Sequence, residues 1–166
     1  MPPANYSPSD IATTLRAVVD DGLAFLLSVP DLRTAERPAD GGWSIREIIG
    51  HLIDSACNNH RRFIINQQAE TMIVDSYDQN AWVERQRYAG RPAAELLALW
   101  AVYNRHLAYV LEAMPSDVLN RPRGPLAGLG FGYITTSDTM ASIGHLADDY
   151  IGHLEHHLAQ IARRLG

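Results

Sequence analysis

Four stretches of this sequence repeat their apolar residues every three or four positions, the spacing that places them on one face of an α-helix. No stretch shows a convincing two-residue alternation of the kind that marks a half-buried strand. An amphipathic helix has to bury its apolar face against another element, and four such helices can do this against one another. The sequence therefore predicts an all-α fold, a four-helix bundle, built as a single domain over residues 1–166.

Capping and helix-breaking residues delimit the expected helices. Ser44 and Glu47 make a capping-box pattern at the start of the second helix. Pro30 ends the first helix, and Pro92 suits the first turn of the third. The expected helices run over about residues 9–27, 44–68, 92–114 and 136–165. The connections rich in Gly and Pro, which we expect to be loops, are 37–42, 70–91 and 121–132.

The composition argues against several classes of protein. A formal net charge of −5, without a cluster of Lys and Arg, argues against nucleic-acid binding. The single cysteine, Cys57, excludes an intramolecular disulfide framework and a multi-cysteine zinc site. The first residues do not resemble a signal peptide, and no apolar stretch approaches the ~18–20 residues that span a bilayer. We therefore expect a soluble, cytoplasmic protein with no membrane partner.

Three histidines, His153, His156 and His157, lie close together near the end of the chain. On a helix that turns about 100° per residue, His153 and His157 share one shoulder of the apolar face, while His156 points away. Side chains four residues apart stand one turn above each other, so His153 and His157 can converge on one metal ion. The alternatives are surface histidines without an ion, or a pair of His153 and His156 turned away from the bundle.

A third ligand would have to come from another helix, because two ligands do not complete a metal site. On the second expected helix, His51 lies about 100° from the apolar face, again on a shoulder. Ser55, Asn58 and Arg62 follow on the same side and make a polar ridge, as expected for the wall of a cleft. The alternative is a half-buried, hydrogen-bonded His51 that binds no metal.

Other polar residues are expected to be structural. No spacing groups the remaining histidines, which are His60, His106 and His145. Cys57 faces away from the expected cleft, which favours a role in packing or at an interface. Asp149, one turn before His153, is placed to orient that ring through a hydrogen bond, although an exposed carboxylate is the simpler interpretation.

Three segments together resemble the DinB/YfiT-like metalloprotein superfamily. The segment 41–55, GGWSIREIIGHLIDS, resembles the family's entry into its second helix. The segment 77–88, YDQNAWVERQRY, resembles the connection that follows that helix. The segment 150–161, YIGHLEHHLAQI, resembles the terminal histidine signature. The three occur in the expected order and extend over nearly the whole chain.

The resemblance implies a four-helix bundle of the DinB type that holds one divalent metal ion with three histidines. Carried over to the matching positions, these ligands are His51, His153 and His157, the trio that helix geometry also favours. The metal in such proteins is commonly nickel, zinc, iron or manganese. The resemblance also implies a homodimer.

An ion with three protein ligands keeps open positions, which is typical of a catalytic rather than a structural site. The resemblance implies two chemistries for a small-molecule substrate: metal-dependent hydrolysis, or S-transfer of a low-molecular-weight thiol such as bacillithiol or mycothiol. Ser55, Asn58 and Arg62 are candidates for holding a polar or anionic group of the substrate, because they share the ridge of His51.

No general base is apparent in the sequence. Glu155 points away from the paired histidines, and Asp54 is placed to orient His51 rather than to attack a substrate. This favours thiol transfer, which needs no separate strong base. The alternative is a non-catalytic metal-binding or stress-response protein that acts as a dimer. Tyr77 and Trp82 lie on the long connection that could roof the cleft.

Overall fold

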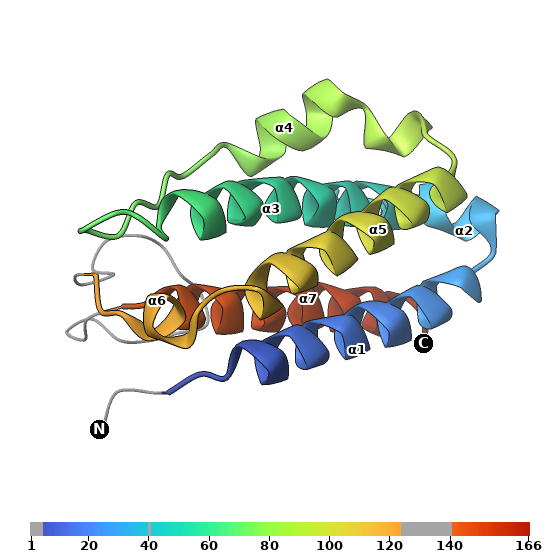
Figure 1. Ribbon diagram of the computed structural model, residues 1–166. Helices are drawn as coiled ribbons and strands as arrows, with labels where there is room; N and C mark the ends of the chain where they lie inside the picture. The colour runs from blue at the N-terminus through green and yellow to red at the C-terminus, as the bar shows by residue number, and fades with distance from the viewer. Residues whose placement is uncertain (1–4, 40, 124–140) are drawn as a thin grey trace.

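The computed structural model describes residues 5–39, 41–123 and 141–166, and every regular element in these ranges is a helix (Figure 1). The long helices are α1 (Pro8–Leu27), α3 (Ile45–Ile65), α5 (Ala93–Glu112) and α7 (Ile143–Leu165). The short helices are α2 (Asp31–Ala35), α4 (Gln79–Gln86), the 3₁₀ helix η1 (Tyr88–Gly90) and α6 (Ser116–Asn120). The prediction of an all-α four-helix bundle is confirmed.

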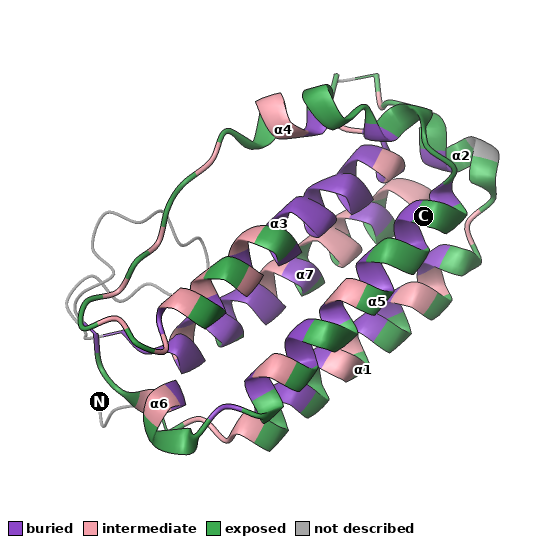
Figure 2. Cartoon of the chain, turned by 45° about the horizontal axis from the view of Figure 1, so that its top comes forward, coloured by how far each residue is buried: buried purple, intermediate pink, exposed green. Residues whose placement is uncertain are grey.

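The four long helices form a ring of neighbours. α5 packs between α1 and α3, and α7 packs between the same two helices on the other side (Figure 1). Figure 2 shows that buried residues concentrate on the inward faces of these helices. Each helix contributes a large side chain to the interior that solvent hardly reaches, and these are Leu15, Phe63, Trp100 and Tyr150. This arrangement makes α3 and α7 direct neighbours, although they are far apart in the sequence.

Reciprocal capping fixes where α3 and α7 begin. At α3, the Glu47 N–H donates to Ser44 Oγ at 3.3 Å, and the Ser44 N–H donates to Glu47 Oε2 at 2.8 Å, which confirms the predicted capping box. Ser142 and His145 cap α7 in the same way. α7 therefore begins after the start predicted near 136–138, residues that lie outside the described ranges.

The loop predicted for 70–91 is wrong in part, because this connection contains α4 and η1. Asp78 starts α4 by accepting a hydrogen bond from the Ala81 N–H at 3.0 Å, a capping signal that the sequence does carry. α2 and α6 were not predicted, because helices of five residues are too short to show a period. α3 and α5 end slightly before their predicted limits, and the connection 121–132 is described only as far as Arg123.

Within the part of the chain that the structure describes, no helix is both long and apolar enough to cross a bilayer.

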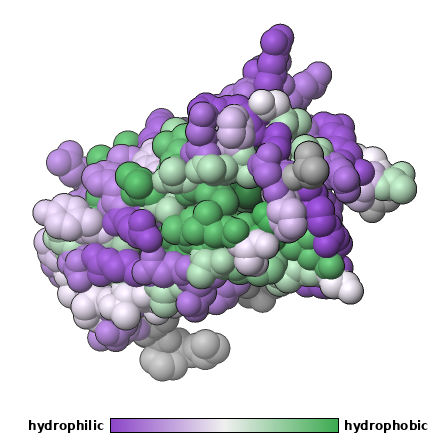
Figure 3. Space-filling model, turned by 90° about the vertical axis from the view of Figure 1, so that its right-hand side faces the viewer, coloured by the Kyte–Doolittle hydropathy of each residue, from purple (hydrophilic) through white to green (hydrophobic). Residues whose placement is uncertain are grey.

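Figure 3 looks onto the end of the bundle where α1 and α7 end and α3 begins, and apolar side chains gather in the middle of this face. Leu27, the last residue of α1, is 63% exposed. The apolar surface therefore lies at the end of the bundle that contains the start of α3.

A close contact between Gly50 and Tyr88 seats η1 on α3. A Cβ atom added to Gly50 would lie 2.0 Å from Tyr88 Cδ2, so only glycine fits without movement. The Tyr88 hydroxyl donates to Asp54 Oδ1 at 2.6 Å, and Gln86 Nε2 donates to the same oxygen at 2.5 Å. Because Gly50 precedes His51, this contact also holds the turn of α3 that carries the histidine.

We expect Gly50→Ala to lower the free energy of unfolding by about 2 kcal/mol, because overpacking a close contact costs roughly 1–3 kcal/mol. Inside a helix the same change would otherwise gain about 1 kcal/mol. Chemical denaturation followed by circular dichroism measures the difference. Gly90→Ala is the control, since its Cβ would meet no described atom within 4 Å. Equal stabilities of the two variants would show that Tyr88 is not seated on α3 as described.

Candidate metal centre

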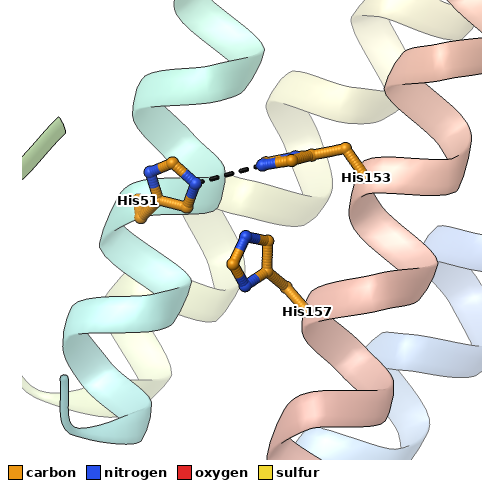
Figure 4. Close-up of side chains that lie close together, drawn as sticks. All are labelled: His51, His153 and His157. Atoms are coloured by element: carbon orange, nitrogen blue, oxygen red, sulfur yellow. Dashed lines mark hydrogen bonds between the residues drawn. The ribbon is translucent and has the colours of Figure 1, made fainter. Parts of the chain in front are cut away.

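His51 on α3 and His153 and His157 on α7 point toward one another across the space between the two helices (Figure 4). One ligand atom from each of the three residues lies within 4.8 Å of the others. The Nε2 atoms of His51 and His153 are 3.1 Å apart. The ring centroids are separated by 5.1 Å for His51 and His153, 4.9 Å for His51 and His157, and 4.6 Å for His153 and His157. Three imidazoles from two helices therefore meet in one place.

Helix geometry explains why α7 contributes two of these residues and not three. His153 and His157 stand one turn apart, so both rings face α3. His156 is exposed and lies outside the group, as its position on the helix predicts. His51 stands in the first half of α3, and its side chain is only 1% exposed. The centre thus lies inside the bundle, toward the end where α3 begins.

Burial keeps the three imidazoles neutral. It is the main cause that lowers the pKa of His51 to about 4 and of His153 to about 3, and the neighbouring histidines add to the effect. Burial also lowers the pKa of His157, although its hydrogen bond to Gln160 acts in the opposite direction. At neutral pH each ring therefore keeps a lone pair, which is the form that binds a metal. Neutral imidazoles suit zinc, copper, iron and nickel.

Two of the three rings form hydrogen bonds through their Nδ1 atoms. His157 Nδ1 lies 2.8 Å from Gln160 Oε1, and His153 Nδ1 lies 3.4 Å from Ser55 Oγ. Such contacts fix the ring orientation and leave the other nitrogen, Nε2, for a ligand. Gln160 was missed in the sequence, although its distance of three residues from His157 on a helix was a usable signal.

His51 has a different environment. Its Nδ1 is buried and has no hydrogen-bond partner among the described residues. The Trp43 ring packs against it at an interplanar angle of 42°, with a centroid separation of 5.0 Å. Asp54, which the sequence placed to orient His51, instead turns toward Tyr88 and Gln86. The position of His51 is therefore set by packing around its ring.

The predicted substrate residues stand on one ridge of α3 but have different contacts. Ser55 is buried beside His153. Asn58 Nδ2 donates to the Asp54 carbonyl oxygen at 2.8 Å, within its own helix. Arg62 donates to the carbonyl oxygen of Asp75 at 2.5 Å, in the connection before α4. The structure brings Ser55 into contact with His153, and a role in substrate binding stays a prediction for all three residues.

Asp149 is buried and not an exposed carboxylate, which corrects the simpler interpretation of the sequence. It lies close enough to Arg62 for its negative charge to raise the pKa of that guanidinium, although burial lowers this pKa by more.

In the long connection, Tyr77 and Trp82 contact each other, with ring centroids 4.9 Å apart. Trp82, Arg85 and Gln86 line a cavity of about 320 Å³ on α4. Trp82, Arg85 and Gln86 belong to α4, which packs against α3.

The family model of the DinB superfamily matches residues 14–161. A protein of Bacillus subtilis named "putative metal-dependent hydrolase YfiT" is 29% identical over 131 residues, which cover 76% of this chain and 68% of that protein. A protein of Oceanobacillus iheyensis with the same functional name is 28% identical over 121 residues, covering 73% of this chain and 64% of its own. The chain thus spans about two thirds of the length of these relatives. No solved structure matches it significantly.

We expect the purified protein to retain about one divalent ion per chain after dialysis, held by the histidine trio. Alanine at His51, His153 or His157 should each remove the ion, because two imidazoles do not complete the site. Elemental analysis of the variants measures the loss. His156→Ala is the matched control on the same helix and should leave the metal content unchanged. Loss of metal from His156→Ala alone would mean that the trio is not the ligand set.

We also expect Gln160→Ala to weaken metal binding by about 10–100-fold, because His157 loses the acceptor that orients its ring. Gln160→Glu keeps an acceptor at the same place and should bind at least as tightly as the unmodified chain. Competition with a chromophoric chelator measures both affinities. Identical affinities of the Ala variant and the unmodified chain would show that Gln160 does not position His157.

Proposed function

The chain belongs to the DinB superfamily, and from this membership and the histidine group we propose that it is an enzyme dependent on one divalent metal ion held by His51, His153 and His157. The observation that carries the proposal is the convergence of three neutral imidazoles from α3 and α7. Nickel, zinc, iron and manganese are the candidate ions, and the three imidazoles favour the first three, because manganese prefers oxygen ligands.

The number of ligands favours catalysis over a structural role. No Cys, Asp or Glu joins the three histidines in residues 5–39, 41–123 and 141–166. A structural zinc site usually has four protein ligands, whereas a catalytic one keeps a position for water or substrate. When bound, an ion of this kind supplies Lewis acidity, which lowers the pKa of a water or thiol that it holds and polarises a carbonyl group.

Hydrolysis is the reaction that the names of the relatives support, since the proteins of Bacillus subtilis and Oceanobacillus iheyensis both carry the name "putative metal-dependent hydrolase". The chain's own part in such a reaction is to orient the ligands. Gln160 holds the ring of His157, Ser55 contacts that of His153, and Trp43 packs against His51. A substrate on the polar ridge would meet Ser55 first, with Asn58 and Arg62 further along α3.

S-transfer of a low-molecular-weight thiol is the second candidate, and the direction of Asp54 favours it. Hydrolysis commonly uses a carboxylate as general base beside the nucleophilic water. Asp54 is the nearest carboxylate to His51 along α3, but Tyr88 and Gln86 both donate to its Oδ1. A thiol is acidic enough to ionise without such a base once its pKa is lowered. The proposal also includes a homodimer, a cytoplasmic location and a small-molecule substrate, without a nucleic-acid or membrane partner.

We expect the metal-loaded chain to turn over either activated esters or a mixture of a low-molecular-weight thiol and an electrophilic acceptor. Activity should disappear with a chelator and return with the ion, because the Lewis acid supplies the chemistry. His157→Ala should lower kcat/KM by more than about 100-fold, which is the largest effect expected from removing a residue that only hydrogen-bonds a ligand. Spectrophotometric assays of product release and of thiol consumption separate the two reactions.

His156→Ala is the control and should keep full activity, since this residue lies outside the histidine group. Turnover of esters alone would support hydrolysis, and consumption of thiol alone would support transfer. A chain that carries the ion but turns over neither substrate class would contradict the enzyme and favour the non-catalytic, metal-binding alternative.

A further inference from the structure

α5 presents a row of apolar side chains to solvent. Leu99 is 46% exposed, and Val102 and Tyr109 are each 64% exposed. His106, which stands between them on the helix, is exposed as well. At about 100° per residue these four positions fall within an arc of about 80°, so they form one stripe along the helix. Figure 2 shows the outer side of α5, where exposed and half-buried residues lie.

The apolar surface continues from α5 onto the neighbouring helix α3. The His60 ring contacts the rings of Tyr103 and His106, with centroid separations of 5.6 and 5.1 Å, so this edge of α3 borders the stripe. Ile64, one turn after His60, is 47% exposed. We call this surface the α5 face, and its residues are Ile64, Leu99, Val102, Tyr103, His106, Tyr109 and Val110.

The charged residues of α5 lie outside this face. α5 has only three of them, Glu95, Arg105 and Glu112. Arg105 pairs with Asp20 at 2.7 Å and Glu112 pairs with Arg16 at 2.5 Å, so both reach toward α1. Glu95 stands near the start of the helix, before the stripe begins. The α5 face is therefore a contiguous surface without charged side chains, which is typical of a site that contacts another molecule.

The composition of the α5 face selects its partner. It contains no Asp, Glu, Lys or Arg, so it offers no complement to a nucleic acid, to a charged membrane surface or to a charged protein. Each copy of the chain carries a formal net charge of −5, so two copies repel each other least where charged side chains are missing. The α5 face is such a surface, and a two-fold symmetric contact would bury it against itself.

The order of residues along the stripe suits two antiparallel copies. The stripe is centred between Val102 and His106, so a two-fold axis at this level places Val102 opposite His106 of the partner subunit. The same axis places Leu99 opposite Tyr109 of the partner subunit. Each aliphatic side chain then meets an aromatic or imidazole ring, and such pairs bury apolar area on both copies.

Charges at the two ends of α5 agree with this arrangement. The same axis brings Arg91, just before α5, to the level of Asp117 of the partner subunit. Arg91 pairs with Glu95 at 2.8 Å, but an exposed pair of this kind contributes little. Asp117 is exposed and has no ion pair within the described ranges. Opposite charges therefore meet at both edges of the contact, which favours antiparallel over parallel copies.

We infer that the α5 face is the interface of a homodimer in which two copies of the chain pack antiparallel about a two-fold axis between Val102 and His106. A helix of 20 residues is about 30 Å long, and two neighbouring helices are about 20 Å wide, which outlines about 600 Å². This is of the same order as the ~800 Å² of accessible surface that each partner buries in a standard interface. The inference assigns an interface to the proposed homodimer and does not rest on the enzymatic activity.

Sedimentation equilibrium of the full chain tests the inference. We expect a dimer at micromolar concentration. Val102→Glu should raise the Kd of the dimer by 100-fold or more, because an unpaired carboxylate would lose its water in the contact. Leu27→Glu is the matched control, since Leu27 is 63% exposed but lies at the end of α1, away from the α5 face. It should leave the Kd unchanged.

Charge reversal tests the antiparallel arrangement. Asp117→Arg should raise the Kd of the dimer by about three- to tenfold, because like charges then meet at both edges. Adding Arg91→Asp to this variant should restore the original Kd. A double variant that dimerises more weakly than Asp117→Arg alone would overturn the antiparallel arrangement.

A folded, unmodified chain that stays monomeric at several hundred micromolar would overturn the inference. A dimer with the same Kd in the unmodified chain and in Val102→Glu would also overturn it, because the interface would then lie elsewhere. Circular dichroism reports whether each variant is folded. Val102→Glu leaves the histidine trio untouched, so its metal content should equal that of the unmodified chain. Failure of the interface can thus be distinguished from failure of the metal centre.

Discussion

The packing of α3 against α7 is the contact on which the candidate site depends. Each helix alone presents histidines on one shoulder of its apolar face, and neither arrangement amounts to more than two ligands. When the apolar faces are buried together, His51 comes within 3.1 Å of His153, measured between their Nε2 atoms. The hydrophobic effect that assembles the bundle therefore also assembles the ligand set.

Burial has two opposing consequences at this centre. It removes the imidazoles from water, which costs free energy unless they find partners, and it keeps them unprotonated. Gln160 and Ser55 supply partners for two of the rings, while Nδ1 of His51 has none in the described ranges. A bound cation would offset part of this cost by binding the ring nitrogens that now lie close together. The three buried histidines are therefore more typical of a metal-binding site than of a hydrophobic core.

α3 packs against α2, α4, η1, α5 and α7. One side carries His51 and Ser55, which face the histidines of α7, and another carries His60, whose ring contacts Tyr103 and His106 of α5. Its third side supports the long connection through Gly50, which leaves room for Tyr88, and through Asp54, which accepts two hydrogen bonds. Because three surroundings meet on a helix of 21 residues, its phase and position are strongly constrained.

The sequence by itself determined what a single helix can determine. Apolar periodicity predicted the four long helices, and the rise and turn of a helix placed His153 and His157 together and turned His156 away. These relations hold within a few residues, so backbone geometry alone sets them. The same geometry put His51 on a shoulder of the second expected helix, and the resemblance to the DinB family identified it as the third ligand.

Only the tertiary structure decided which distant residues meet. The direction of Asp54 toward Tyr88, the contact of Ser55 with His153, and the meeting of His60 with Tyr103 all depend on which helices pack together and at what depth. The short helix α4 packs against α3. Its eight residues carry too little periodicity to predict a helix, so its stability depends on this packing. Local spacing is set by covalent geometry, whereas contacts across the bundle are set by the burial of whole helix faces, which no short stretch of sequence specifies.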